Sequence, residues 1–163
     1  MLFLMFPTHL ALGYLVSIYS RFAIAPLIVG SAMPDIIDRS LLLLGLAQQP
    51  HTLGHSAIVV VPICAIAIHQ LGTRAVALIV GWLAHVITDF LNIVTTHGPT
   101  IARHYLLYPG SRPETQGEFL TITIHFPFTG VTHTANPGVL VLEAGVLCLA
   151  LWTGLQNRNR FPL

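Results

Sequence analysis

The longest apolar run of this 163-residue sequence, residues 75–94, encloses a histidine and an aspartate. His85 and Asp89 are four positions apart, so on a helix both project from one face, about 6 Å apart along the axis. An ionised aspartate in apolar surroundings is costly unless it is paired or bound to a cation. No lysine or arginine between residues 75 and 99 could pair with it. We expect this pair to bind a metal ion; the alternative is a His–Asp hydrogen bond that only holds two helices together.

The rest of the composition predicts that this run lies in a membrane. Hydrophobic residues make up 54% of the chain and charged residues 8%, whereas a soluble domain carries roughly a quarter charged residues. We therefore predict one all-α domain over residues 1–163, a polytopic integral membrane bundle with the lipid bilayer as its partner. A net charge of +1 argues against nucleic-acid binding. Cys64 and Cys148 lack metal or disulfide spacing, so we expect both to be buried.

Apolar segments along the chain predict about four to five membrane helices, the first pair short. Residues 75–94 and 139–155 approach the roughly 20 residues of a full span, and residues 57–71 reach it with their flanks. Pro34 is predicted to end the second helix, with a short third helix opening at Asp35. Thr52 is predicted to cap a helix that runs through His55. The orientation stays open, because arginines fall on both sides of the spans.

Residues 95–137 differ in kind from the rest of the chain. Proline and glycine recur there, and most of the remaining polar residues fall in this segment. Polar and apolar residues alternate over residues 121–126, which predicts a short strand. We expect this segment to form one extramembrane lobe or lid between the last two spans.

Four more polar residues lie in three short blocks of sequence: His9 in the first, Asp35 and Asp38 in the second, and His55 in the third. Helix capping or local pairing explains each block when it is considered alone. If consecutive helices alternate in direction, however, all four fall at the same end of the bundle as His85 and Asp89. The predicted metal ligands are therefore His9, Asp35, Asp38, His55, His85 and Asp89. Nitrogen and oxygen donors without sulfur suit zinc, with manganese or iron as alternatives. Six donors exceed one tetrahedral zinc, so one or two divalent ions are expected.

The other histidines are expected at helix ends or in loops, although His97 could approach the site because it follows Asp89 by two turns. His51 belongs to the same block as His55, but its position gives it no predicted role.

At these blocks the sequence resembles the family of LexA-regulated, membrane-bound metal-dependent hydrolases. The matching segments occur in the family's order over residues 7–109: Thr8-His9, Pro34-Asp35…Asp38, Gly54-His55-Ser56, Gly81-Trp82…His85…Asp89, and Leu106-Leu107-Tyr108-Pro109. Two features depart from the pattern. Two residues separate Asp35 from Asp38 where the family has one, and the Arg-Gly that usually precedes Thr-His-Ser is absent. The ligand order is also similar to that of the zinc-dependent phospholipase C and nuclease group.

The resemblance implies an integral membrane hydrolase, which in a bacterium would lie in the cytoplasmic (inner) membrane. A metal ion would lower the pKa of water and polarise a phosphoryl or carbonyl oxygen. Asp35 and Asp38 are the catalytic candidates, since the one that is not a ligand is free to act as the base or as a partner that supports a ligand. We expect a small-molecule or lipid phosphoester or ester as substrate. A non-enzymatic metal carrier or transporter and a purely structural His/Asp cluster are the alternatives.

Overall fold

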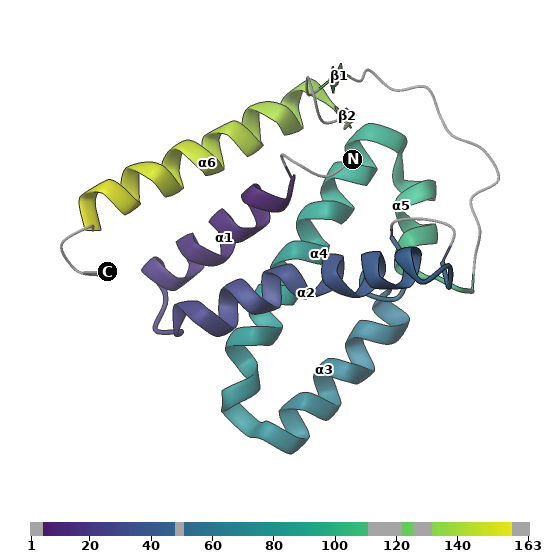
Figure 1. Cartoon of the computed structure of the whole chain (residues 1–163), viewed down its shortest axis with the longest axis horizontal. Coiled ribbons are helices and arrows are strands. Elements are labelled where there is room, and N and C mark those ends of the chain that lie inside the picture. The colour runs from purple at the N-terminus through teal and green to yellow at the C-terminus, as the bar shows by residue number, and fades with distance from the viewer. Residues whose placement is uncertain (1–4, 48–50, 111–121, 126–131, 158–163) are drawn as a thin grey trace.

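The computed structural model describes residues 5–47, 51–110, 122–125 and 132–157. Within these ranges the chain is mainly α-helical, as predicted, with one short 3-10 helix and one two-stranded hairpin (Figure 1). The elements are α1 (Met5–Tyr19), α2 (Ile24–Leu43), α3 (Ala57–Leu71), η1 (Gly72–Ala75), α4 (Val76–His97), α5 (Pro99–Leu106), β1 (Ile122–His125), β2 (Thr132–Ala135) and α6 (Pro137–Asn157).

Helix α4 is the central element of the fold. It packs most extensively on α2, and it also contacts α1 and α5. On the other side of α1 lies α6, so the helices form an open arrangement rather than a closed barrel (Figure 1). The turn η1 joins α3 to α4, and an apolar cluster that includes Val60, Cys64, Ile79 and Trp82 fills the space between these two helices.

Two glycines let the backbones of α2 and α4 approach closely. A Cβ on Gly30 would overlap the carbonyl oxygen of Leu78, and a Cβ on Gly81 would overlap the carbonyl oxygen of Leu27. Small residues at a helix crossing permit this kind of contact, which is frequent between helices in membranes. The crossing matters for the site, because it sets the α2 residues 31–38 beside the α4 residues 85–89.

We expect Gly81→Ala to destabilise the protein by about 1–3 kcal/mol, because the added methyl group must push two helix backbones apart. Gly145→Ala on α6 is the matched control, since a Cβ there meets no atom within 4 Å. It should be neutral or slightly stabilising, because alanine is the better helix former. Thermal unfolding of both variants tests this; equal unfolding midpoints would contradict a close α2–α4 contact.

The structure corrects two predicted helix boundaries. Helix α2 continues through Pro34 to Leu43, so no separate helix opens at Asp35. The proline removes one backbone hydrogen bond, but a helix packed tightly against a neighbour tolerates this loss. Thr52 does not cap a helix through His55, because α3 begins only at Ala57. Both residues lie in a turn that is held by side-chain hydrogen bonds.

The segment 95–137 contains more regular structure than predicted. It begins with the end of α4 and includes α5, while residues 111–121 and 126–131 lie outside the described residues. The strand predicted over residues 121–126 is confirmed by β1, which pairs antiparallel with β2, Ile124 opposite His133.

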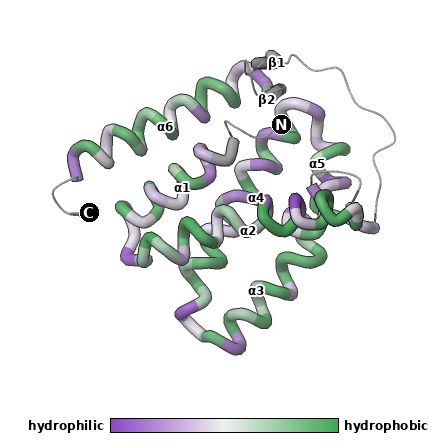
Figure 2. Tube along the Cα trace, in the orientation of Figure 1, coloured by the Kyte–Doolittle hydropathy of each residue, from purple (hydrophilic) through white to green (hydrophobic). Residues whose placement is uncertain are grey.

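Two helical stretches of the described chain are long and apolar enough to cross a membrane. One is Ala57–His97, which comprises α3, η1 and α4, and the other is Pro137–Asn157, which is α6. Hydrophobic residues dominate most of α3 and α6, and hydrophilic residues appear toward the C-terminal end of each helix (Figure 2). Cys64 is buried as predicted, but Cys148 is exposed, because the rest of the chain leaves most of the α6 surface uncovered.

Candidate metal centre

The centre is built on one face of α4, where His85 and Asp89 are one turn apart and both are buried. The Nδ1 atom of His85 lies 2.6 Å from the carbonyl oxygen of Ser31 on α2. Since a carbonyl oxygen only accepts hydrogen bonds, Nδ1 carries the proton and donates it. The Nε2 atom of His85 is therefore left with a lone pair that faces the other site residues. The α2–α4 crossing thus fixes the tautomer of the histidine.

Asp89 is the hub of the cluster, since four histidines converge on its carboxylate. Its Oδ1 lies 2.9 Å from Nε2 of His9 on α1. Its Oδ2 lies 2.9 Å from Nε2 of His55, 3.3 Å from Nε2 of His85 and 3.4 Å from Nε2 of His51. Because the two oxygens lie beside different histidines, either oxygen of Asp89 could hold a metal ion together with a neighbouring imidazole.

Asp35 on α2 completes the set of donors. Its Oδ1 lies 4.0 Å from Nε2 of His85, and its Oδ2 lies 3.5 Å from Arg39 one turn later. Three groups of residues present one donor atom each within 4.8 Å of one another: His9, His85 and Asp89; Asp35, His55 and His85; and His51, His55 and Asp89. The groups share members, so these residues form one continuous cluster that could hold a metal ion.

Asp38 lies behind His55 instead of facing this cluster. Its Oδ2 accepts hydrogen bonds from Nδ1 of His55 and the backbone N–H of Thr52, each at 2.7 Å. Its Oδ1 accepts from the Thr52 hydroxyl at 2.8 Å and the Gly54 N–H at 2.7 Å. Both oxygens are thus engaged by donors, and Asp38 belongs to none of the three groups. These contacts place Asp38 against His55 and the 51–56 turn, and its role as a ligand, a base or a partner that supports a ligand stays a prediction.

The same contacts decide the charge of His55. Burial disfavours its charged form, yet hydrogen bonds to Asp38 and Asp89 raise its pKa to about 9. Two carboxylates on one imidazole therefore attract positive charge strongly, which either a proton or a divalent cation can supply.

The structure places five of the six predicted ligands together: His9, Asp35, His55, His85 and Asp89. His9 stacks on His85 with ring centroids 3.7 Å apart, and its buried Nδ1 has no hydrogen-bond partner among the described residues. His97 takes part in none of the three groups of the described chain.

His51 is the site residue that sequence reasoning missed. It lies in a turn rather than on a helix, so its spacing of four from His55 carried no information about a shared face. The turn is fixed by long-range contacts: Asp38 binds Thr52 and Gly54, and the indole of Trp82 donates to the Gly54 carbonyl oxygen at 2.9 Å. The only signal in the sequence was membership of the same short block as His55.

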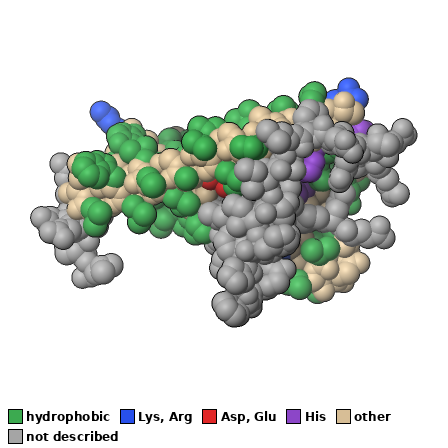
Figure 3. Space-filling view, turned by 90° about the horizontal axis from the view of Figure 1, so that it is seen from above, with side chains coloured by type: hydrophobic (Ala, Val, Ile, Leu, Met, Phe, Trp, Pro, Cys, Tyr) green, Lys and Arg blue, Asp and Glu red, His purple; other side chains and the backbone are tan. Residues whose placement is uncertain are grey.

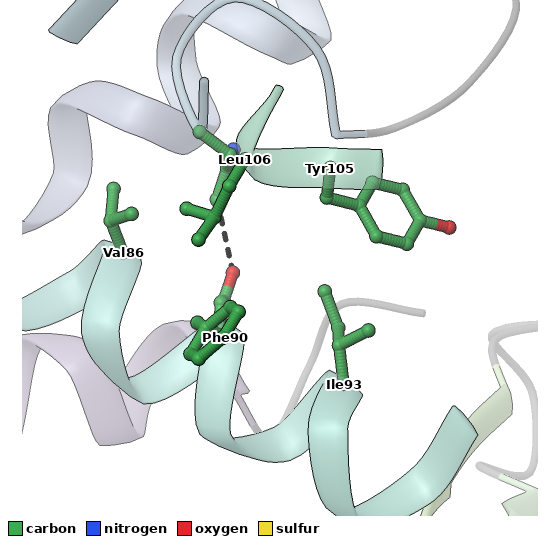
Figure 4. Close-up of a pocket in the computed structure, with 7 residues that line it drawn as sticks. Val86, Phe90, Ile93, Tyr105 and Leu106 are labelled. Carbon is green, nitrogen blue, oxygen red and sulfur yellow. Dashed lines mark ion pairs between the residues drawn. The ribbon is translucent and has the colours of Figure 1, made fainter. Parts of the chain in front are cut away.

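A small recess opens beside His55 and Asp89, between α4 and α5. Its other walls are apolar: Val86, Phe90 and Ile93 come from α4, and Tyr105 and Leu106 come from α5 (Figure 4). The ion pair between His55 and Asp89 forms its polar side. The cluster therefore borders a partly apolar opening.

Comparison of this chain with protein-family models, with curated proteins and with solved structures gives no match. The function therefore has to be inferred from the geometry of this centre.

Proposed function

We propose that this protein is a membrane-embedded, metal-dependent hydrolase that acts on a phosphoester or ester. The observation that carries the proposal is the convergence of four imidazole Nε2 atoms on the buried carboxylate of Asp89. Such a set is expensive to assemble in an apolar interior unless it serves a cation. The sequence resemblance to membrane-bound metal-dependent hydrolases points the same way.

The donor chemistry fits zinc first and manganese or iron as alternatives. The donors are imidazole nitrogens and carboxylate oxygens, without a thiolate. Two of the imidazoles are already oriented by hydrogen bonds on the opposite nitrogen, as is usual for histidine ligands. A bound ion would supply Lewis acidity and make water nucleophilic near neutral pH.

We assign Asp35 either to proton transfer or to direct binding of the metal ion. Its side chain is 15% exposed, against 0% for Asp38, and its Oδ1 lies 4.0 Å from Nε2 of His85, beyond hydrogen-bonding distance. A general base has to reach water and substrate, which a carboxylate enclosed by four donors cannot do. Asp38 is accordingly a positioning residue for His55.

Surface composition supports the membrane location. Hydrophobic side chains are spread over the described surface that Figure 3 presents, between areas of backbone and other side chains. Helix α3 contains no charged residue and α6 contains only Glu143, and both expose large aliphatic side chains. At 1.5 Å per residue, α4 and α6 are each more than about 30 Å long and could cross the hydrocarbon core. We propose that α1, α2 and α3 complete a bundle of four to five membrane helices.

A metal carrier is the second candidate, and the surroundings of the cluster argue against it. A carrier needs a polar path to both faces of the membrane. On the η1 side of His85, however, an apolar cluster that includes Trp82, Ile79, Ala75 and Val60 packs between α3 and α4. A cluster of this kind offers a metal ion no ligands, which favours the one-sided hydrolase over the carrier.

The test is metal analysis of the purified protein followed by a hydrolysis panel. We expect stoichiometric divalent metal, and metal-dependent cleavage of a phosphoester or ester. His85→Ala should lose both, whereas His69→Ala should lose neither, since His69 is an exposed histidine at the end of α3. Absence of metal from the wild-type protein would contradict the proposal. Metal without hydrolysis, together with uptake into proteoliposomes, would favour the carrier.

A further inference from the structure

Among the arginines of the described chain, Arg39 is the one that forms an ion pair with a residue of the candidate centre. It follows Asp35 by one turn on α2, and its side chain is 29% exposed. Its one ion pair with the site joins Nη2 to Oδ2 of Asp35 at 3.5 Å, which is long for such a contact. Its Nε is buried and has no hydrogen-bond partner within the described ranges. A guanidinium presents five N–H donors, so most of this group's capacity is available to another acceptor.

The position of Arg39 brings these donors close to the metal ligands. The carboxylate of Asp35 lies between them, with Oδ2 toward Arg39 and Oδ1 toward Nε2 of His85. A group bound at the cluster is thus separated from the guanidinium by the width of one carboxylate. The other arginines in the described part of the chain, Arg21, Arg74 and Arg103, make no ion pair with a site residue.

We propose that Arg39 binds the phosphoryl group of the substrate, so that the substrate is an anionic phosphoester rather than a neutral carboxylic ester. This inference rests on the proposed function. The planar guanidinium matches the oxygens of a phosphate and can bind two of them at once, and it stays charged at any physiological pH. A neutral ester offers no comparable negative charge. The opposing interpretation is that Arg39 only neutralises Asp35 within α2.

Binding of inorganic phosphate to the metal-loaded protein separates these interpretations. Arg39→Gln should weaken phosphate binding on the order of ten- to hundredfold in calorimetry, the effect expected for losing hydrogen bonds to a charged group. Arg39→Lys should restore part of the affinity, because lysine keeps the positive charge but lacks the paired N–H donors with which a guanidinium binds two phosphate oxygens. Metal content should stay unchanged in both variants. Arg21→Gln, in the loop before α2, is the matched control and should bind phosphate like the wild type.

A second arm uses detergent micelles that contain phosphatidic acid in place of inorganic phosphate. Tighter binding of the lipid than of the free ion would identify a lipid headgroup as the source of the phosphoryl group, and equal binding would identify a soluble phosphoester. Arg39→Gln should weaken both.

Three results would overturn the inference. The first is unchanged phosphate affinity in Arg39→Gln. The second is loss of metal from that variant, since Arg39 would then act through Asp35. The third is a metal-loaded wild-type protein that hydrolyses neutral esters and does not bind phosphate, which would leave the proposed hydrolase intact. Failure of the wild type to bind metal would instead contradict the proposed function itself.

Discussion

Asp89→Asn is expected to abolish stoichiometric metal binding. Asparagine preserves the shape of the side chain but removes the negative charge on which four histidines converge, and it leaves one carbonyl oxygen where there were two carboxylate oxygens. The loss of affinity should exceed the roughly 10–100-fold that is typical of residues that only support a ligand. Metal content after dialysis against a chelator, measured by mass spectrometry, gives the result directly.

Thr88→Val is the matched control for this substitution. Thr88 is the residue before Asp89 on α4, and its hydroxyl donates only to the Ala84 carbonyl oxygen of its own helix. Valine has nearly the same shape, so the control tests whether a change at this point of α4 disturbs the site by itself. Retention of full metal content by Asp89→Asn would show that the histidines and Asp35 suffice. Asp89 would then serve to hold the helices together.

Asp38→Asn should produce the largest loss of stability among the site variants. The carboxylate accepts four hydrogen bonds, from His55, Gly54 and two groups of Thr52, and it is completely buried. Removing one partner of a buried charged pair costs about 3–5 kcal/mol, because the charge of the other partner is left uncompensated. Asparagine also offers one acceptor oxygen to donors that two oxygens served before. Chemical unfolding of the metal-free protein in detergent measures this difference. Ser40→Ala, on the exposed side of the same helix, should change stability little.

The effect on metal binding distinguishes the two roles considered for Asp38. If it positions His55, the Asn variant should retain a metal site with affinity lowered about 10–100-fold. Complete loss of metal with unchanged stability would instead make Asp38 a direct ligand, as the sequence pattern predicted. A normal metal affinity together with normal stability would contradict both roles.

Local sequence patterns predicted much of the site. The His-x-x-x-Asp spacing in an apolar run places His85 and Asp89 on one helix face, whatever the tertiary arrangement. Strict helix alternation then suggested that His9, Asp35 and His55 meet this pair, and the structure brings them together. Helix boundaries were harder to predict from the sequence. The proline rule placed a helix end at Pro34, whereas packing against α4 carries α2 on to Leu43.

The roles of individual polar residues depended on contacts between distant parts of the chain. The sequence left Asp35 and Asp38 equivalent. The tertiary structure separates them. The three positions from Asp35 to Asp38 are less than a full turn of α2, so Asp38 faces residues 51–56 while Asp35 faces His85. The turn formed by residues 51–56 also brings His51 to the cluster. No periodic pattern could predict this, because the turn has no periodicity and its conformation depends on contacts with Asp38 and Trp82.

Composition and residue spacing alone predict the helical class, the apolar character and the pair on α4, because these are local properties of the sequence. Three features required the tertiary structure: which donors lie together, which carboxylate contacts His55 and which faces the cluster, and the position of Arg39 beside Asp35. They depend on the close crossing of two helix backbones at Gly30 and Gly81, which are far apart in the sequence.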